Sequence, residues 1–480
     1  MPSEKDNLPQ PHVVILGAGP AGTGAAYQLI RTGKAKVTVL EQRDSVGGNA
    51  GSFALGGMRV DYGSHRLHPA CDPEILKDLK NLLGEDLLLR RRHGRIRLRG
   101  RWIHFPLKPA DLLLRLPKSF IFGAGIDMVR KLIPGRGMET ETFASMLERS
   151  LGRTICRDFY FPYARKLWGM PPEQLSVTQA RRRVSANSLA KVIRKIASSI
   201  PGFNPQGAGR FFYPRRGYGE ISERLYEVAR NGEAEFLFGA KITAIECEGG
   251  RVTAVGYEQN GSRRRIPASL VWSTLPLTIL EKCIQPEAPP EVGAAASKID
   301  FRGMILIYLV LEQPQFTEYD AHYFPEESIP ISRLSEPKNY SGTSDPPNRT
   351  VLCAELPADL GSREWSMSDA ELGKAMCSWL GQAGLPVKAA VLEVTTRRLR
   401  QAYPSYSVGY EESFEVLDRW LGGINGLLTF GRQGLFAHDN THHALFMAYS
   451  AVECLSRDGA FNLGKWREFR KIFETHVVED

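Results

Sequence analysis

The sequence predicts an α/β protein built around a Rossmann-type unit in a three-layer ββα arrangement, joined to a mixed helical and antiparallel-sheet domain. Residues 13–16 form a short continuous apolar run, which is typical of a fully buried parallel strand. A glycine-rich turn follows at once, and residues 21–30 then have the composition of a helix. Residues 36–40 predict a second strand, so the chain opens with a βαβ unit.

The rest of the chain is expected to contain a helical region, two sheets and a final helix. Residues 70–207 are expected to be mostly helical, because leucine-rich stretches there are interrupted by prolines. The runs that predict strands are residues 235–246, 252–257, 268–273, 305–311, 351–355, 389–397 and 426–430. A polar stretch rich in Pro, Gly and Ser, residues 340–348, predicts a loop, and residues 440–457 predict a helix.

Composition places the chain among globular proteins. Its 480 residues are 42% hydrophobic and 24% charged. No apolar run approaches the roughly 20 residues of a membrane-spanning helix, so no transmembrane segment is expected. Residues 1–12 lack the apolar core of a signal peptide. The seven cysteines never stand as C-x-x-C, so we expect no disulfide framework, no zinc site and a reducing, cytoplasmic location.

The chain is basic, with a formal net charge of +9. Its densest arginine cluster spans residues 90–101, and arginine alternates with apolar residues from 95 to 99. This alternation predicts a half-buried strand with guanidinium groups along one face. A solvated surface, an anionic substrate and a membrane surface all stay open for this cluster. Nucleic acid is not expected, because no recognised binding module accompanies the charge.

The turn after the first strand has the spacing of a dinucleotide-binding loop. Gly17 permits a tight turn, Gly19 lets the backbone approach a pyrophosphate, and Gly22 lets the helix pack closely on the strand. The helix N-terminus then offers free N–H groups to the phosphates. Glu41 stands 19 residues beyond Gly22, at the end of the second strand, where a carboxylate can bind ribose hydroxyls.

Residues 41–48 indicate which dinucleotide this turn binds. Glu41 and Gln42 begin a stretch that ends in the pair Gly47 and Gly48, directly after the second strand. This arrangement resembles the fingerprint of the FAD superfamily that contains amine oxidases, protoporphyrinogen oxidases and UDP-galactopyranose mutases. The resemblance implies FAD as the cofactor and an FAD-binding Rossmann-type domain. The two glycines would let a loop lie flat against the cofactor.

Further blocks along most of the chain are similar to UDP-galactopyranose mutases within this superfamily. They are DYGSHRLH at 61–68, YARKLWGMPP at 163–172, YPRRGY at 213–218, AYP at 402–404 and GRQG at 431–434. The resemblance implies that the loop with the two histidines of the first block passes over the flavin. It also implies that the last block and the helix after it close over the ring. Residues 436–443 lack a tyrosine with which the mutases bind the substrate diphosphate, which puts UDP-galactose as substrate in doubt.

The resemblance and the local chemistry together imply a set of site residues. The expected cofactor contacts are Gly17, Gly19, Pro20, Ala21, Gly22, Glu41, Gln42, Gly47, Gly48, Asn49, Ala50, His65, Arg66, Ile242, Gly431, Arg432, Asn440 and Thr441. The expected substrate contacts are Arg97, Trp168, Tyr218 and Tyr403. His65, His68 and His442 are candidates for proton transfer, with packing as the alternative role for each. No metal is expected, because His438, His442 and His443 lack the flanking pattern of a zinc enzyme.

The expected division of the chain follows from these motifs. Residues 1–69, 208–298 and 425–480 are the expected FAD-binding segments, residues 70–207 a helical substrate or cap region, and residues 299–424 the substrate-domain sheet. The leading functional hypothesis is an FAD-dependent oxidoreductase that transfers a hydride between a small organic substrate and flavin N5. The alternatives are a redox-neutral mutase-like enzyme that uses reduced flavin on a nucleotide sugar, and a non-catalytic escort-type protein of the same fold. A small-molecule substrate is expected. Whether it is anionic stays open, as does the oligomeric state.

Overall fold

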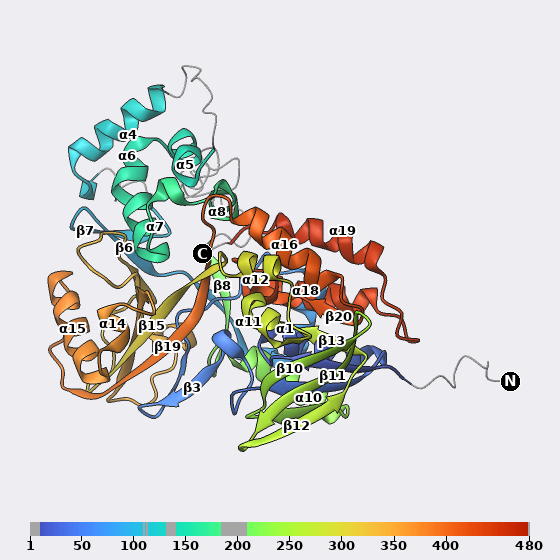
Figure 1. The fold of residues 1–480 in the computed structure, drawn as a ribbon. Helices are drawn as coiled ribbons and strands as arrows, with labels where there is room; N and C mark the ends of the chain where they lie inside the picture. The colour runs from blue at the N-terminus through green and yellow to red at the C-terminus, as the bar shows by residue number, and fades with distance from the viewer. Residues whose placement is uncertain (1–9, 109–110, 112–113, 131–140, 184–208, 479–480) are drawn as a thin grey trace.

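The computed structural model describes residues 10–108, 111, 114–130, 141–183 and 209–478. The described chain forms two adjoining units, one around a parallel sheet and the other around a seven-stranded sheet with helices beside it (Figure 1). The expected segment boundary at residue 207 lies outside the described residues, and the division of the chain into segments stays a prediction. Among the described residues, no helix is long and apolar enough to cross a membrane.

The first unit is built on a five-stranded parallel sheet with the strand order β20-β13-β1-β2-β9. Its strands are β1 (His12–Leu16), β2 (Lys36–Glu41), β9 (Glu235–Phe238), β13 (Leu270–Ser273) and β20 (Leu427–Thr429). They come from three separate stretches of chain, so this sheet forms only when distant segments meet.

Side chains alternate between the two faces of this sheet and build three layers. Val13 and Ile15 share a core with helices α1 (Pro20–Thr32) and α18 (Thr441–Cys454). Val14 and Leu16 pack on the opposite face, against a smaller sheet. That sheet consists of β10 (Lys241–Glu248), β11 (Arg251–Gln259), β12 (Ser262–Pro267) and β14 (Ile284–Gln285). The predicted three-layer Rossmann-type fold is confirmed.

The second unit is a mixed sheet with the strand order β19-β15-β18-β17-β16-β6-β7. Its strands are β6 (Gly94–Leu98), β7 (Arg101–Phe105), β15 (Asp300–Leu311), β16 (Ala321–Tyr323), β17 (Arg333–Ser335), β18 (Thr350–Ala358) and β19 (Val391–Ser405). Every neighbouring pair is antiparallel except β16 with β6, which is parallel. Helix α15 (Asp369–Gln382) covers one face and shares a core with β15 and β18.

Within the stretch expected to be mostly helical, three strands between residues 87 and 105 follow the helix at 73–83, so that expectation is wrong for this part. Strand β5 (Leu87–Arg91) pairs with β8 (Arg210–Pro214), and β6 pairs with β7 in a hairpin. Arg99 and Gly100 turn the hairpin with φ values of 51° and 74°, as a tight two-residue turn requires. The alternation of arginine with apolar residues did indicate β6, but its partner β16 lies far along the chain. Local pattern therefore could not show that the strand belongs to this sheet.

The other α-helices follow the predicted order only in part. They are α2 (Pro73–Leu83), α4 (Lys118–Arg130), α5 (Phe143–Leu151), α6 (Arg153–Ile155), α7 (Phe161–Trp168), α8 (Val177–Arg183), α10 (Glu220–Asn231), α11 (Leu277–Cys283), α12 (Pro290–Ala296), α13 (Pro337–Ser341), α14 (Arg363–Ser366), α16 (Tyr410–Gly422), α17 (Gly431–Gly434) and α19 (Leu463–Glu474).

Helix α13 runs into the loop expected at 340–348, and Tyr340 is only 2% exposed. Its hydroxyl hydrogen-bonds Ser64 Oγ at 2.5 Å and accepts from Arg66 at 2.9 Å, so tertiary contacts bury the first residue of that polar stretch.

Candidate active site

A cavity of about 500 Å³ lies where the two units meet. Its walls come from the turns after β1, β2 and β13, from the loop after β4 (Met58–Asp61), from β15 and β19, and from the start of α18. The carboxyl ends of several parallel strands therefore open into it, which is where open α/β sheets bind their ligands.

The glycine turn at one end of the cavity is shaped by close backbone approaches. Gly17 has a φ of 97°, which is favourable only for glycine. A Cβ on Gly22 would lie 1.9 Å from the carbonyl oxygen of Gly17, so no side chain fits between helix and strand. A Cβ on Gly48 would lie 3.2 Å from Gly19 Cα. The backbones of Gly19 and Gly48 therefore form a narrow cradle in which a pyrophosphate can reach main-chain N–H groups.

Glu41 is buried at the end of β2 and organises the same region. Its Oε2 accepts the N–H of Ala18 at 2.8 Å, and its Oε1 accepts the N–H of Arg43 at 2.9 Å. Arg43 in turn donates to the Gly48 carbonyl oxygen at 2.8 Å. Each carboxylate oxygen keeps a second lone pair. Glu41, which lines the cavity, can thus accept a ribose hydroxyl while it holds the turn and the glycine pair together.

The N-terminus of α18 reaches the other end of the cavity. Asn440 and Thr441 line the space, and His443 Nδ1 accepts the N–H of Asn440 at 3.2 Å, which caps the helix. The positive end of the helix dipole therefore lies at the cavity, where it stabilises negative charge. Gln433 Oε1 is buried beside the space without a hydrogen-bond partner in the described chain, so it can accept the N–H of a flavin ring. Both ends of the cavity thus fit the two halves of FAD.

His65 lies in the wall next to a buried carboxylate network. Its Nε2 is 3.0 Å from the carbonyl oxygens of Asn49 and Tyr62, so Nε2 carries the proton and Nδ1 is the acceptor nitrogen. The ring stacks on Tyr218 with a centroid distance of 5.3 Å. Burial lowers the pKa of His65 and keeps the imidazole neutral.

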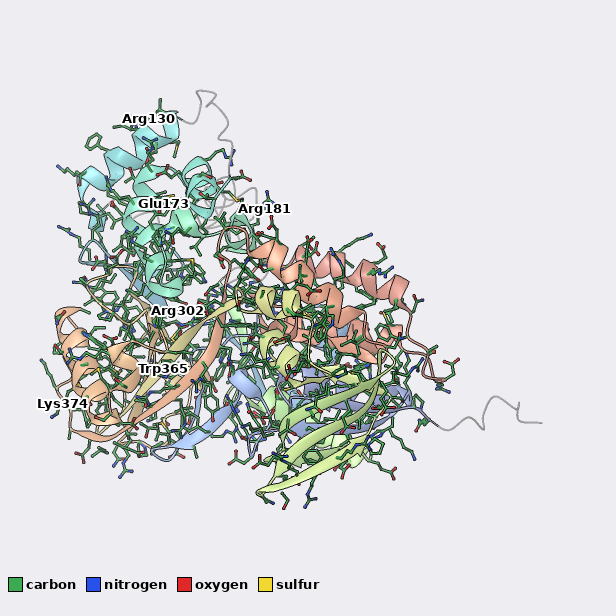
Figure 2. All side chains as sticks on the ribbon, in the orientation of Figure 1. Arg130, Glu173, Arg181, Arg302, Trp365 and Lys374 are labelled. Carbon is green, nitrogen blue, oxygen red and sulfur yellow. The ribbon has the colours of Figure 1, made fainter. Side chains whose placement is uncertain are left out.

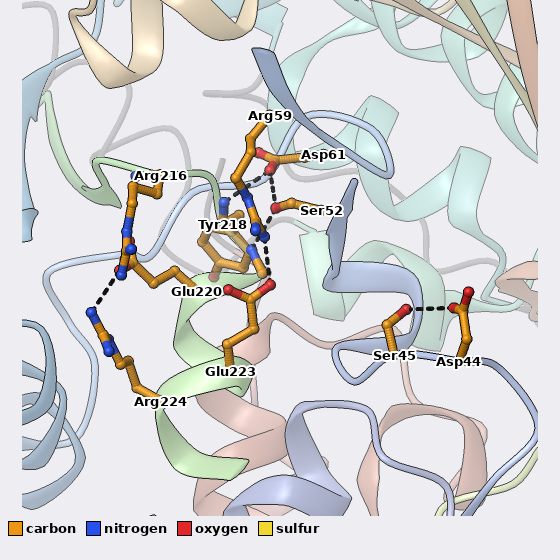
Figure 3. A network of polar contacts seen from close by, with 11 residues as sticks. Asp44, Ser45, Ser52, Arg59, Asp61, Arg216, Tyr218, Glu220, Glu223 and Arg224 are labelled. Atoms are coloured by element: carbon orange, nitrogen blue, oxygen red, sulfur yellow. Dashed lines mark hydrogen bonds and ion pairs between the residues drawn. The ribbon is translucent and has the colours of Figure 1, made fainter. Parts of the chain in front are cut away.

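Asp61 supports this arrangement from behind. Its carboxylate accepts hydrogen bonds from Ser52 Oγ at 2.6 Å and from the N–H of Tyr218 at 2.8 Å (Figure 3). The hydroxyl of Tyr213 donates to its other oxygen at 2.7 Å. Burial nevertheless raises the pKa of Asp61. The network fixes Tyr218, and through it the face on which His65 stacks.

Arginines dominate the wall formed by the seven-stranded sheet. Arg333 forms a two-point ion pair with Glu355, with distances of 3.0 and 2.9 Å, and Glu355 also accepts the N–H of Ser64 at 2.8 Å. Arg398 donates to main-chain carbonyl oxygens, among them that of Trp365 at 2.9 Å. Taken together, the lining contains seven arginines (43, 66, 92, 333, 398, 400 and 432) and three carboxylates (Glu41, Glu355 and Asp439). The cavity is therefore basic.

The structure brings most of the predicted site residues to this one cavity. The predicted residues in its lining are Gly17, Gly19, Pro20, Ala21, Glu41, Gln42, Gly48, Asn49, Ala50, His65, Arg66, Arg432, Asn440, Thr441, Tyr218 and Tyr403. Gly22, Gly47 and Gly431 lie next to lining residues in the chain and shape the backbone behind it. Their contacts with a cofactor or substrate stay predictions.

Five predicted residues are not brought to the cavity. Arg97 forms an ion pair with Glu326 on the outer part of the sheet. Trp168 is 4% exposed in a core of the helical region, whereas Tyr163 and Leu167 of the same helix do line the cavity. Ile242 packs beneath the parallel sheet. His68 and His442 lie against each other with ring centroids 6.5 Å apart, outside the lining.

Helix geometry explains the place of Trp168, because its neighbour Leu167 on α7 lines the cavity from another side of the helix. His438, in the irregular stretch before α18, points into the cavity in place of His442, with its ring 5.1 Å from that of Tyr403. Neighbours on a helix or strand face different sides, so a motif locates a segment more surely than it locates each side chain.

One residue behind the cavity wall and several in its lining were not among the predicted site residues. Asp61 stands behind the wall, and its place in the recognised block at 61–68 is the sequence signal that could have indicated it. Asp439 is fully buried and binds Arg182 at 3.0 Å and His476 at 2.9 Å. Arg400 carries no sequence signal, because nothing in the local pattern shows that this part of β19 meets the cavity.

These features define a class of protein. A Rossmann turn with a carboxylate placed to accept ribose hydroxyls lies at one end of the cavity. A helix N-terminus with an open hydrogen-bond acceptor lies at the other, as in flavoproteins that bind FAD in an extended form. The family comparison agrees: residues 20–436 match the family of flavin containing amine oxidoreductases. The chain belongs to this family of FAD-dependent oxidoreductases, and FAD is its cofactor.

Individual relatives match shorter stretches of the chain. Phytoene dehydrogenase of Streptomyces griseus is 42% identical over 288 residues, which are 52% of this chain and 52% of that protein. Putrescine oxidase of Kocuria rosea is 40% identical over 82 residues, 17% of this chain and 16% of that protein. The alignments thus span about half the length of the first relative and less of the second.

Solved structures match almost the whole fold at low identity. A reduced UDP-galactopyranose mutase gives a TM-score of 0.79 at 22% identity, with 93% of this chain and 94% of that chain covered. Cyclohexylamine oxidase from Brevibacterium oxydans gives 0.64 at 15% identity, with 96% and 100% covered. The superfamily resemblance that the motifs indicated is confirmed at the level of fold.

Proposed function

We propose that the protein transfers a hydride between a small anionic organic substrate and N5 of FAD. The observation that carries this proposal is one continuous cavity that joins the glycine turn to an arginine-rich wall beside His65. Bound flavin supplies the hydride chemistry. The chain has to bind and orient both reactants, exclude water and manage a proton.

His65 is suited to the proton. Its Nε2–H is occupied by two main-chain carbonyl oxygens, which leaves Nδ1 as the nitrogen that can accept a proton from a substrate hydroxyl or amino group. The lowered pKa keeps this nitrogen unprotonated at neutral pH. Stacking on Tyr218, itself held by Asp61, restricts the ring to one orientation.

The charge of the cavity supports an anionic substrate. Arg92 and Arg400 lie in the lining, while Arg398 adds its charge there and donates its N–H groups to other protein groups. The carboxylates nearby are already engaged, Glu355 by Arg333 and Asp439 by Arg182. A carboxylate or phosphate on the substrate can therefore bind to guanidinium groups. The same charge opposes a diamine or polyamine, which would carry positive charge into the basic space.

The direct test is anaerobic mixing of the oxidised holoenzyme with separate panels of anionic, neutral and cationic small molecules. We expect loss of the oxidised-flavin absorbance with members of the anionic panel and none with putrescine or longer polyamines. Reduction by amines alone would overturn the substrate class but leave the flavin assignment intact. A purified protein that holds no flavin and takes up none from added FAD would contradict the cofactor site itself.

A second candidate reaction is favoured by the same arginines. They could hold the diphosphate of a nucleotide sugar, in a redox-neutral rearrangement that needs reduced flavin. The dithionite-reduced enzyme would then convert a nucleotide sugar to an isomer with no net change in flavin absorbance. Conversion of an anionic substrate to a product two electrons more oxidised would favour hydride transfer instead.

A further inference from the structure

Helix α4 presents an apolar face to the outside of the molecule. In the part of the chain that the structure describes, fourteen large apolar side chains are exposed, and five of them lie between residues 114 and 129. They are Leu114 (81% exposed), Phe122 (71%), Val129 (64%), Met128 (54%) and Ile126 (53%). Such a concentration differs from the scattered single exposures that are normal on soluble proteins.

The two faces of α4 are clearly separated. Phe120 and Asp127 point inward: Phe120 packs with a core beneath β6, and the Asp127 carboxylate accepts the N–H of Thr154 at 2.6 Å. Phe122, Ile126 and Val129 follow the spacing i, i+4, i+7 and share the opposite face. The inner contacts therefore hold the apolar face outward, at the outer edge of the helical region (Figure 1).

The charges around this face are mainly positive. Beside it, Glu148 shares a hollow with Ile126 and Arg130 but forms an ion pair with Arg153 at 3.7 Å. Between residues 114 and 130, the exposed charged residues are Arg115, Lys118 and Arg130, while the single carboxylate, Asp127, is 8% exposed. Arg130 stands at the far end of the helix, at the extremity of the molecule (Figure 2). Helix α4 has only 13 residues, about 20 Å of helix, which is too short to cross a bilayer.

We propose that α4 binds the surface of an anionic lipid bilayer, with Phe122, Ile126 and Val129 in the interface and Lys118 and Arg130 at the headgroups. An apolar face flanked by basic residues on a short helix is the arrangement of interfacial membrane helices. A second copy of the chain fits this face less well. A two-fold pairing of antiparallel helices would bring Lys118 of one copy near Arg130 of the other, and Glu148 beside Arg130 already pairs with Arg153.

The test is flotation of the full-length holoenzyme with vesicles of phosphatidylcholine, with and without phosphatidylglycerol. We expect binding to the anionic vesicles that weakens in about 0.5 M salt. The triple variant Phe122→Ser, Ile126→Ser, Val129→Ser should bind at least about tenfold more weakly. The matched control is Val391→Ser, Leu392→Ser, which removes two apolar side chains of 39% and 45% exposure on β19 and should bind like the parent.

Flavin content and the midpoint of thermal unfolding check that each variant is folded. If the triple variant does not fold, Lys118→Gln, Arg130→Gln still tests the proposal, since it should lose binding to anionic vesicles while keeping its flavin. The proposal is overturned if the parent protein stays in the unbound fraction with anionic vesicles, or if the variants float like the parent. It is equally overturned if the parent sediments as a dimer, the triple variant as a monomer, and neither floats.

Discussion

The two ends of the cavity are built by different means. The nucleotide end consists mainly of backbone: a glycine turn, a glycine pair and one buried carboxylate, with contacts so close that a single Cβ would collide. The substrate end consists of side chains, chiefly arginines and His65, that project from another sheet and from a loop. Backbone contacts leave little room for change, whereas long side chains can be exchanged without moving the chain. We therefore expect mutations at the first end to act on cofactor binding as a whole, and mutations at the second end to have graded effects on catalysis.

The largest effect is expected at the nucleotide end. Gly19→Asp places a carboxylate in the cradle against Gly48, where the pyrophosphate belongs, and should abolish FAD binding because two negative charges would meet. The measurement is the flavin-to-protein absorbance ratio after purification and after reconstitution with FAD. Gly361→Asp, at an exposed glycine with open space around it, is the control and should keep full flavin. A yellow, stoichiometric Gly19→Asp protein would contradict the cradle.

His65→Ala should leave FAD bound but lower kcat by about 100-fold, because the proton acceptor is lost. Steady-state kinetics with the substrate found in the anaerobic panel measures this effect. His68→Ala is the matched control: it removes a histidine of the same block that lies outside the lining, and its kcat should stay close to that of the parent. Equal losses in both variants would make the role of the loop structural rather than chemical.

A smaller effect is expected from single arginines. Arg400→Ala should raise KM for an anionic substrate by about tenfold and leave kcat nearly unchanged, since one charge-assisted contact is removed from a basic wall. Arg397→Ala removes another exposed arginine of the same strand, one that lies outside the lining, and should have no effect on KM. A KM that responds equally to both substitutions would point to general electrostatics instead of a direct contact.

The last prediction concerns the stability of α18, whose N-terminus lines the cavity. Burial lowers the pKa of His443 from 6.5 to about 3, so the unfolded chain takes up a proton in a pH range where the folded protein does not. The neutral His443 of the folded protein contributes its full stabilisation above pH 6.5. As the pH falls from 6.5 towards 3, the free energy of unfolding decreases by up to about 1.4 kcal/mol for each pH unit. Urea unfolding at pH 7 and pH 5 measures how far the free energy of unfolding falls between these two values. We expect a smaller fall for His443→Gln than for the parent protein. An unchanged pH dependence would assign the loss of stability to other groups.

The local sequence determined the nucleotide end almost completely. Gly17, Gly19, Gly22 and Glu41 act through backbone conformation and through a spacing of a single βαβ unit, so their positions can be deduced from neighbours in the chain. The cap of α18 at Asn440 can be deduced in the same way, because it depends only on residues in the first turn of that helix. The blocks of resemblance also located the segments that meet at the cavity, including the loop of His65.

Only the tertiary structure decided which side chains of those segments face the cavity. His438 lines it and His442 does not, although both stand in the same short stretch, and Arg400 lines it while Arg97 pairs with Glu326. The hairpin β6–β7 joins its sheet through β16, which lies far along the chain. A side chain's direction depends on how its helix or strand is rotated against distant partners. That rotation is set by packing between residues hundreds of positions apart, which local pattern does not encode.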